Sequence, residues 1–98
     1  MAKKVVLSPT AKMKLEELLV YLKQEWSEKV KQEFIEKLDE KIHQVSQYPN
    51  SCPESRAFKN LYKCVVTKQT TFYYRIKEEE IEIATLFDTR QDPQKLNP

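Results

Sequence analysis

Residues 61–87 read LYKCVVTKQTTFYYRIKEEEIEIATLF, and this stretch decides the fold. Apolar side chains recur at every second position, which is the period of a half-buried β-strand. The pattern predicts three strands, at 61–67, 71–77 and 81–87, that form an antiparallel meander. Neither predicted turn contains glycine, so we expect connections of three to five residues instead of the tightest two-residue hairpins.

The residues before this stretch have a helical period. Ser8-Pro9 and Ser27 are suited to begin helices, and Pro49 ends the second helix by Tyr48. Between these points apolar side chains recur at spacings of three and four. The predicted stripes are Ala11, Leu15, Leu18, Leu19, Leu22 and Trp26 on the first helix, and Val30, Phe34, Leu38, Ile42 and Val45 on the second.

A short β-branched run at 4–7 predicts one more strand, so the element order is β-α-α-β-β-β. A sheet needs a cover on one face, and the helical hairpin is the element available for it. We therefore expect an α+β fold, with the hairpin packed on a four-stranded, mostly antiparallel sheet and the first strand at an inner position. The 98 residues are enough for one domain, 1–98, which ends in a polar tail at 88–98.

The chain contains no glycine, although average usage would give about seven in this length. Phosphate-binding loops of the G-x-G-x-x-G and P-loop types need glycine for tight turns and close backbone approach. The nucleophile elbow G-x-S-x-G and the EF-hand loop need it for the same steric reason. These four kinds of site are excluded.

The charge balance and the cysteine content also limit which ligands and partners we expect. Seventeen Lys and Arg against fifteen Asp and Glu give a net charge of only +2, which does not indicate a dedicated nucleic-acid binder. Cys52, Cys64 and the single His43 have no zinc-binding spacing, so we expect two free thiols, no metal and no cofactor. No apolar run has the length of a membrane span, and we expect a cytoplasmic protein without membrane contact.

In this order and spacing the residues resemble the RelE/ParE toxins of type II toxin-antitoxin systems, also described as plasmid-stabilisation proteins. The resemblance covers nearly the whole chain. It rests on Val5-Val6-Leu7-Ser8-Pro9-Thr10-Ala11, Tyr21-Leu22, Trp26-Ser27, Phe34, Leu38, Tyr48-Pro49, Tyr74-Arg75-Ile76, and the closing Leu86-Phe87-Asp88-Thr89-Arg90-Gln91-Asp92-Pro93. The family's fold, a helical hairpin on a mostly antiparallel sheet, agrees with the order of elements predicted above.

The resemblance implies a bacterial toxin that arrests growth and is silenced by a cognate antitoxin. ParE-like members inhibit DNA gyrase, whereas RelE-like members cut mRNA on the ribosome with clustered lysines and arginines and a C-terminal tyrosine. Here Thr71 falls near the place of an arginine in the RNases, and no tyrosine follows Arg90. Gyrase inhibition is therefore preferred. A metal-independent endoribonuclease, and a degenerate member that only binds antitoxin, are the alternatives.

Three arginines are the tentative catalytic candidates: Arg90, Arg75 and Arg56. The candidates for target binding are Lys63, Tyr73, Arg75 and Arg90. A structural explanation competes with each arginine. Arg90 can pair with Asp88 or Asp92 to hold the tail, and Arg75 can pair across strands with Glu82. Arg56, Lys59 and Lys63 can keep a solvated strand edge charged against unwanted pairing.

Two aromatic residues of the first helix are candidates for antitoxin binding. Tyr21 lies off the apolar stripe, so we expect it to meet a partner. Trp26 continues the stripe, so the core is its preferred place and the antitoxin groove its alternative.

Overall fold

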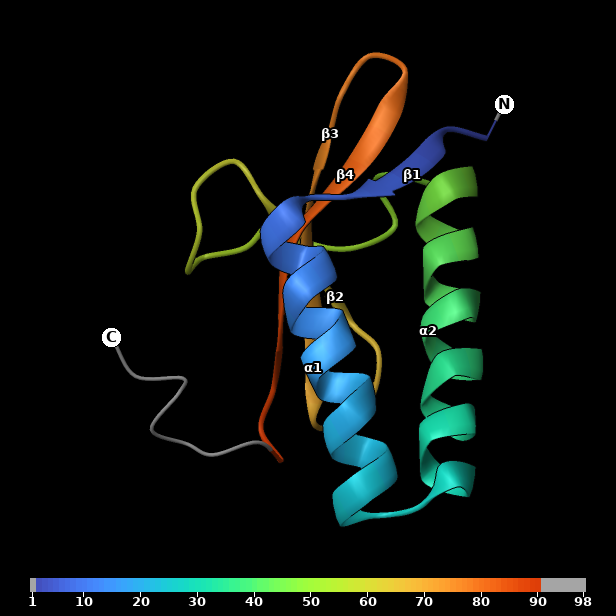
Figure 1. Cartoon of the computed structure of the whole chain (residues 1–98). Coiled ribbons are helices and arrows are strands. Elements are labelled where there is room, and N and C mark those ends of the chain that lie inside the picture. Colours follow the sequence, from blue (N-terminus) through green and yellow to red (C-terminus); the bar gives the residue numbers. More distant parts are fainter. Residues whose placement is uncertain (1, 91–98) are drawn as a thin grey trace.

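The computed structural model describes residues 2–90. The element order is β-α-α-β-β-β, as predicted. The elements are β1 (Lys4–Leu7), α1 (Pro9–Glu25), α2 (Glu28–Gln47), β2 (Tyr62–Val65), β3 (Thr70–Ile76) and β4 (Glu80–Asp88). Figure 1 shows α1 and α2 side by side against the sheet.

Both helices begin at the predicted serines. The Ser8 hydroxyl accepts a hydrogen bond from the Ala11 amide, and the Ser27 hydroxyl accepts one from the Val30 amide, each at 3.0 Å. These contacts satisfy amides that the first helical turn leaves free. The second helix ends at its cap residue Tyr48, as Pro49 predicts.

The sheet order is β1-β4-β3-β2, and β1 runs parallel to β4. The antiparallel meander of β2, β3 and β4 is confirmed, but the inner position predicted for the first strand is wrong. Connections at 66–69 and 77–79 keep the meander strands adjacent, which leaves β1 a place only at an outer edge. Both connections have the predicted length of three to five residues.

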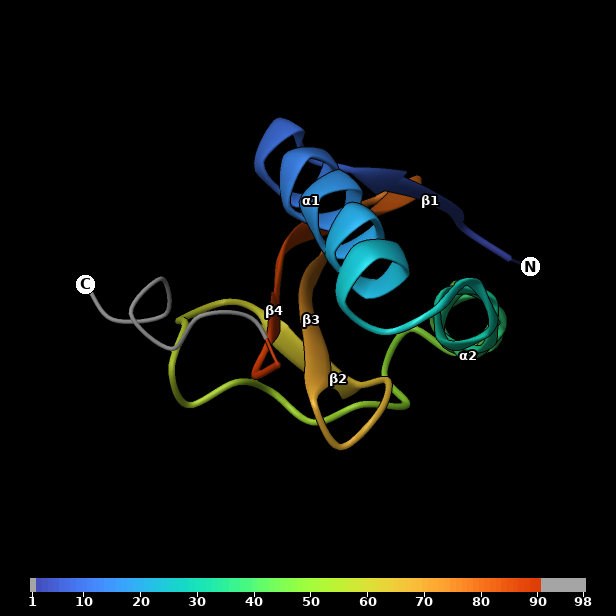
Figure 2. The same ribbon diagram turned by 60° about the horizontal axis from the view of Figure 1, so that its bottom comes forward.

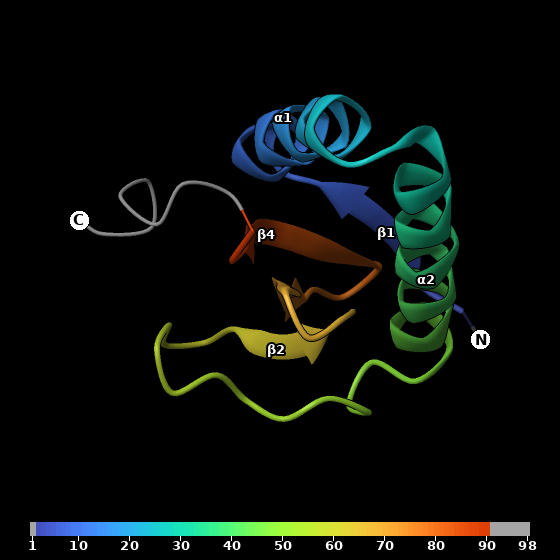
Figure 3. The same cartoon turned by 90° about the horizontal axis from the view of Figure 1, so that it is seen from below.

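The core lies between the helical hairpin and one face of the sheet. Its helical members are Ala11, Leu18, Leu22, Phe34, Leu38 and Val45, and its sheet members include Cys64, Phe72, Tyr74, Ile81, Ile83 and Leu86. Figure 2 shows the two helices on the same side of the strongly twisted sheet. Segment 49–61 runs along the free side of β2, as Figure 3 shows from below.

Trp26 does not belong to this core, contrary to the stripe prediction. Helix α1 ends at Glu25, and Trp26 is its cap residue with φ −120° and ψ −90°, outside helical geometry. The indole consequently leaves the line of the stripe and is 57% exposed.

A bulge in β4 changes which side chains face the core. Tyr73 is paired with Thr85 and Tyr74 with Ile83, so Ala84 is an extra residue between them. The extra residue reverses the alternation of inward and outward side chains. Asp88, predicted to begin the tail, is instead the fully buried last residue of β4. Residues 91–98 of the predicted tail lie outside the described residues.

Candidate functional site: the outer sheet face and the Asp88 cluster

The strand register brings several candidate residues together on the sheet face that points away from the core. We call it the outer face; it consists of Lys63, Val65, Thr71, Tyr73, Arg75, Glu82, Thr85 and Phe87. Lys63, Tyr73 and Thr85 form one row across the strands, and Val65, Thr71 and Phe87 form the next. The row of Thr71 therefore contains no cationic side chain.

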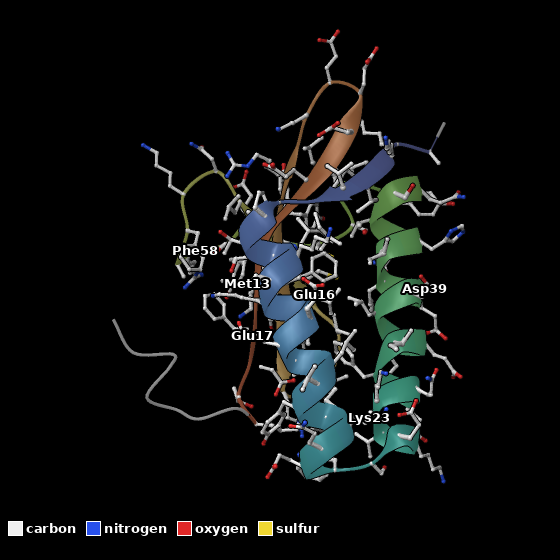
Figure 4. The ribbon with its side chains drawn as sticks, in the orientation of Figure 1. Met13, Glu16, Glu17, Lys23, Asp39 and Phe58 are labelled. Carbon is white, nitrogen blue, oxygen red and sulfur yellow. The ribbon has the colours of Figure 1, made fainter. Side chains whose placement is uncertain are left out.

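Aromatic rings cover part of the outer face. Phe58, from segment 49–61, meets Tyr73 edge to face with ring centroids 4.8 Å apart and lies parallel to Phe87 at 6.1 Å. From α1, Lys14 places its ammonium 3.8 Å from the Phe87 ring centroid, a cation-π contact. Burial lowers the pKa of Lys14, against the opposing effect of Glu17. Figure 4 shows Phe58 beside α1 on the side away from α2.

Arg75 forms the predicted cross-strand pair. Its Nε lies 3.2 Å from Glu82 Oε1, and Lys77 Nζ approaches the same oxygen at 3.6 Å. The confirmed pair explains how Arg75 is held on the sheet surface, although half of its side chain remains open to solvent.

The three other basic candidates come from segment 49–61 and from β2, and all are exposed to solvent. They are Arg56, Lys59 and Lys63, and Lys63 lies on β2, whose outer edge is partly covered by pairing with residues 53–55. Lys59 and Arg75 line a pocket of about 400 Å³ together with Glu54. The carboxylate offsets part of the positive charge there, so the pocket is not a strongly cationic site.

Arg90 is bound within a polar cluster at the far end of β4. The Asp88 cluster consists of Thr70, Asp88 and Arg90. Arg90 donates from Nη2 to Asp88 Oδ2 at 2.7 Å and from Nε to Oδ1 at 3.1 Å, while its backbone amide donates to Oδ1 at 2.8 Å. The Thr70 hydroxyl donates to Oδ2. Only 14% of the Arg90 side chain is exposed, so the predicted structural pairing with Asp88 is confirmed.

Opposing effects act on the Asp88 carboxyl. Burial by itself raises the pKa of an acid, because it disfavours the charged form. The hydrogen bonds from Arg90 and Thr70 outweigh burial, and the pKa of Asp88 is lowered. The carboxylate is therefore ionised at neutral pH and forms a bidentate ion pair with the Arg90 guanidinium.

The burial of the two aromatic candidates for antitoxin binding is the reverse of what the apolar stripe predicts. The Tyr21 hydroxyl donates to the Arg90 carbonyl, and its ring packs against the core. Trp26 is mostly exposed, with the Arg90 guanidinium carbon 6.0 Å from its ring centroid. Trp26, the cap residue of α1, is therefore more exposed to a partner than the partly buried Tyr21.

The sequence profile described as "ParE toxin of type II toxin-antitoxin system, parDE" matches residues 5–93. The chain belongs to the ParE toxin family. This assignment agrees with the two helices packed on a four-stranded mixed sheet.

Solved structures share the fold of this ParE-family chain. A chromosomal ParDE system from P. aeruginosa matches with a TM-score of 0.75 at 12% identity, covering 89% of this chain and 96% of that one. A conserved hypothetical protein from Helicobacter pylori matches with a TM-score of 0.59 at 18% identity, covering 90% and 96%. The YoeB dimer from Staphylococcus aureus gives 0.59 at 15% identity, covering 89% and 97%. A search of curated protein sequences gave no significant match.

Neither helix of this ParE-family chain, within residues 2–90, is long and apolar enough to cross a membrane. Sequence reasoning missed three residues that shape the site, Lys14, Phe58 and Thr70, and it missed the burial of Asp88. A bulge hides the inward direction of Asp88, and the contacts of Lys14 and Phe58 join segments far apart in the chain. Only the i, i+2 spacing of Asp88 and Arg90 gave a signal in advance.

Proposed function

We propose that this chain is the toxin of a type II toxin-antitoxin pair, that it arrests growth by binding and inhibiting DNA gyrase, and that a cognate antitoxin neutralises it in the cytoplasm. Membership of the ParE family supports the toxin role. The observation that favours gyrase over mRNA is the state of the arginines: Arg90 is bound to Asp88, and Arg75 is bound to Glu82.

Cleavage of an RNA phosphodiester without metal needs preorganised positive charge where the transition state becomes more negative. Arg90 lies in the Asp88 cluster, and its charge is already offset by a buried carboxylate. Thr71, at the level where the resemblance places an arginine in the RNases, lies between Val65 and Phe87 on neighbouring strands. The described side chains therefore support recognition better than phosphodiester cleavage.

Protein recognition fits the outer face. Its aromatic pair of exposed Phe58 and partly buried Tyr73, with Lys63 and Arg75 beside it, combines the ring and cation types that dominate binding at protein interfaces. We place the contact with gyrase on this face. Tyr73 is the central anchor, because it lies between Lys63 and Thr85 in its row and meets Phe58 above.

The test compares two targets with one toxin preparation. Purified toxin is added to gyrase in a supercoiling assay that also detects cleaved DNA trapped on the enzyme, and in parallel to ribosomes translating a defined mRNA. We expect inhibited supercoiling, trapped cleaved DNA and intact mRNA. Cut mRNA with unaffected gyrase would establish the endoribonuclease instead, and no effect on either would indicate a member that only binds antitoxin.

A pair of variants connects the activity to the outer face. Tyr73→Ala should raise the concentration needed for half-inhibition of gyrase at least about tenfold, since it removes a central aromatic anchor. Tyr48→Ala is the matched control, because Tyr48 is 67% exposed at the end of α2, away from the outer face. Equal inhibition by the two variants, with both shown to be folded by circular dichroism, would remove Tyr73 from the contact.

A further inference from the structure

The segment before β2 continues the sheet by a short antiparallel pairing. Glu54 forms an isolated bridge with Tyr62, the Ser55 amide donates to the Leu61 carbonyl at 2.7 Å, and the Lys63 amide donates to the Pro53 carbonyl at 2.8 Å. Each step back along the segment before β2 is thus matched by one step forward along β2. If the same register continues past the pair of Pro53 and Lys63, the next pair is Cys52 opposite Cys64.

The type of pairing fixes how close two opposed residues come. The hydrogen bonds flank the Glu54–Tyr62 pair instead of joining it, so it is a non-hydrogen-bonded pair, and Cys52 with Cys64 is the next pair of that type. Non-hydrogen-bonded pairs in regular strands have Cα atoms about 4.5 Å apart and side chains on the same face. Disulfides need a Cα separation of about 4.4–6.8 Å, so a Cys52–Cys64 pair in this register would meet the requirement.

The two thiols also affect one another directly. Burial first, and then a hydrogen bond with Cys52, raise the pKa of Cys64 to about 12. Cys64 is 2% exposed in the core, whereas Cys52 is only partly buried and packs against the core from outside. Cys52 is thus the thiol that a reagent from solvent can reach, and Cys64 is the thiol directly behind it.

We propose that Cys52 and Cys64 are a reversible oxidation site, at which a low-molecular-weight disulfide such as oxidised glutathione forms an intramolecular disulfide. The Cys52 thiol loses its proton to solvent and attacks one sulfur of the reagent, releasing one glutathione thiolate and leaving a mixed disulfide on Cys52. The Cys64 thiol then loses its proton and attacks the Cys52 sulfur, releasing the second thiolate. Two electrons pass from the cysteines to the reagent, and the two released thiolates take up the two protons.

The disulfide would close a ring around residues 53–63. This segment holds Arg56 and Phe58, and it ends at Lys63 on the outer face. Tyr74, whose hydroxyl donates to the Pro49 carbonyl at 2.7 Å, already fastens the start of the loop to the core. Oxidation would therefore add a second, covalent attachment of this loop to the core. It would restrict the motion of the loop that places Phe58 over Tyr73.

The experiment treats the full reduced chain with excess oxidised glutathione and follows its intact mass. The wild-type chain should lose two hydrogens and retain no glutathione. Cys64→Ala should retain one glutathione on Cys52, because the thiol that releases it is missing. Cys52→Ser should show neither change, because the remaining thiol is buried, and it tests the site even where Cys64→Ala fails to fold.

A second measurement asks whether the disulfide fits the native fold. The oxidised wild-type chain should melt at least about 4 °C higher than the reduced chain, since ring closure restricts the unfolded state, and dithiothreitol should reverse the shift. Trypsin should cut after Arg56 and Lys59 more slowly in the oxidised form. A stable glutathione adduct on the wild type, a covalent dimer, an unreacted chain, or a disulfide that lowers the melting temperature would each overturn the proposal. These readouts need neither gyrase nor antitoxin, so they do not depend on the proposed function.

Discussion

Asp88 shows how one residue links the sheet to the end of the described chain. Its two carboxylate oxygens accept hydrogen bonds from the Thr70 hydroxyl and from the guanidinium and backbone amide of Arg90. Because the carboxylate is fully buried, its hydration is replaced entirely by these donors. Tyr21 binds the Arg90 carbonyl from α1, so the cluster also holds the helix against the end of β4.

Asp88→Asn should lower the free energy of unfolding by about 3 kcal/mol at pH 7, because it leaves a largely buried guanidinium without its counter-charge. The pKa of Asp88 is lowered in the folded state, so its contribution is fully present above the unfolded value of about 3.9. The contribution disappears as the pH falls through the folded pKa. Urea unfolding from pH 7 to pH 2 should show the two chains converging in acid.

The matched control for Asp88→Asn is Asp39→Asn, which changes an exposed carboxylate on α2. Its unfolding free energy should stay within about 0.5 kcal/mol of the wild type. If Asp88→Asn were as stable as Asp39→Asn at pH 7, the Asp88 cluster would not have the structural role assigned to it.

At the scale of elements, the two helix caps differ in one hydrogen bond. Ser8 and Ser27 both cap a helix with the same 3.0 Å contact, but the Ser8 hydroxyl also donates to the Ala84 carbonyl at 2.7 Å. Ala84 is the extra residue of the bulge in β4. Ser8 therefore links the start of α1 to the bulge at which the alternation of core-facing and outward-facing side chains in β4 is reversed.

Ser27→Ala should cost about 1 kcal/mol of unfolding free energy, the usual effect of a lost cap. Ser8→Ala should cost about 2 kcal/mol, because a second hydrogen bond is lost and the Ala84 carbonyl is left without this donor. Chemical denaturation of both variants under identical conditions measures the difference. Equal costs would mean that the contact with Ala84 contributes nothing to stability.

At the scale of the whole molecule, local signals predicted the elements, and contacts between distant segments explain the errors. Ser8, Ser27 and Pro49 fixed the helix ends, and the period of two fixed the meander. The Arg75–Glu82 pair followed from strand alternation. The parallel pairing of β1 with β4 and the burial of Asp88 did not follow, because the first is a contact between distant segments and the second depends on a bulge. Trp26 is exposed because α1 ends at Glu25, one residue before the last position of the predicted apolar stripe.

Trp26 is the described residue with which we test the antitoxin contact. A partner that binds only the folded toxin must raise its melting temperature, by an amount set by concentration and affinity. Trp26→Ala should weaken antitoxin binding at least about tenfold, since an exposed tryptophan is a frequent interface anchor. Its own stability should change little, because the indole is 57% exposed.

Titration calorimetry and melting curves with the purified antitoxin measure both effects. Tyr48→Ala, which removes a ring that is 67% exposed at the opposite end of α2, should retain the wild-type affinity and the wild-type shift in melting temperature. If both variants bound antitoxin equally well, the partner would cover another surface. If the antitoxin left the melting temperature of the wild type unchanged, the pairing itself would fail, since linkage allows no binding to the native state without stabilisation.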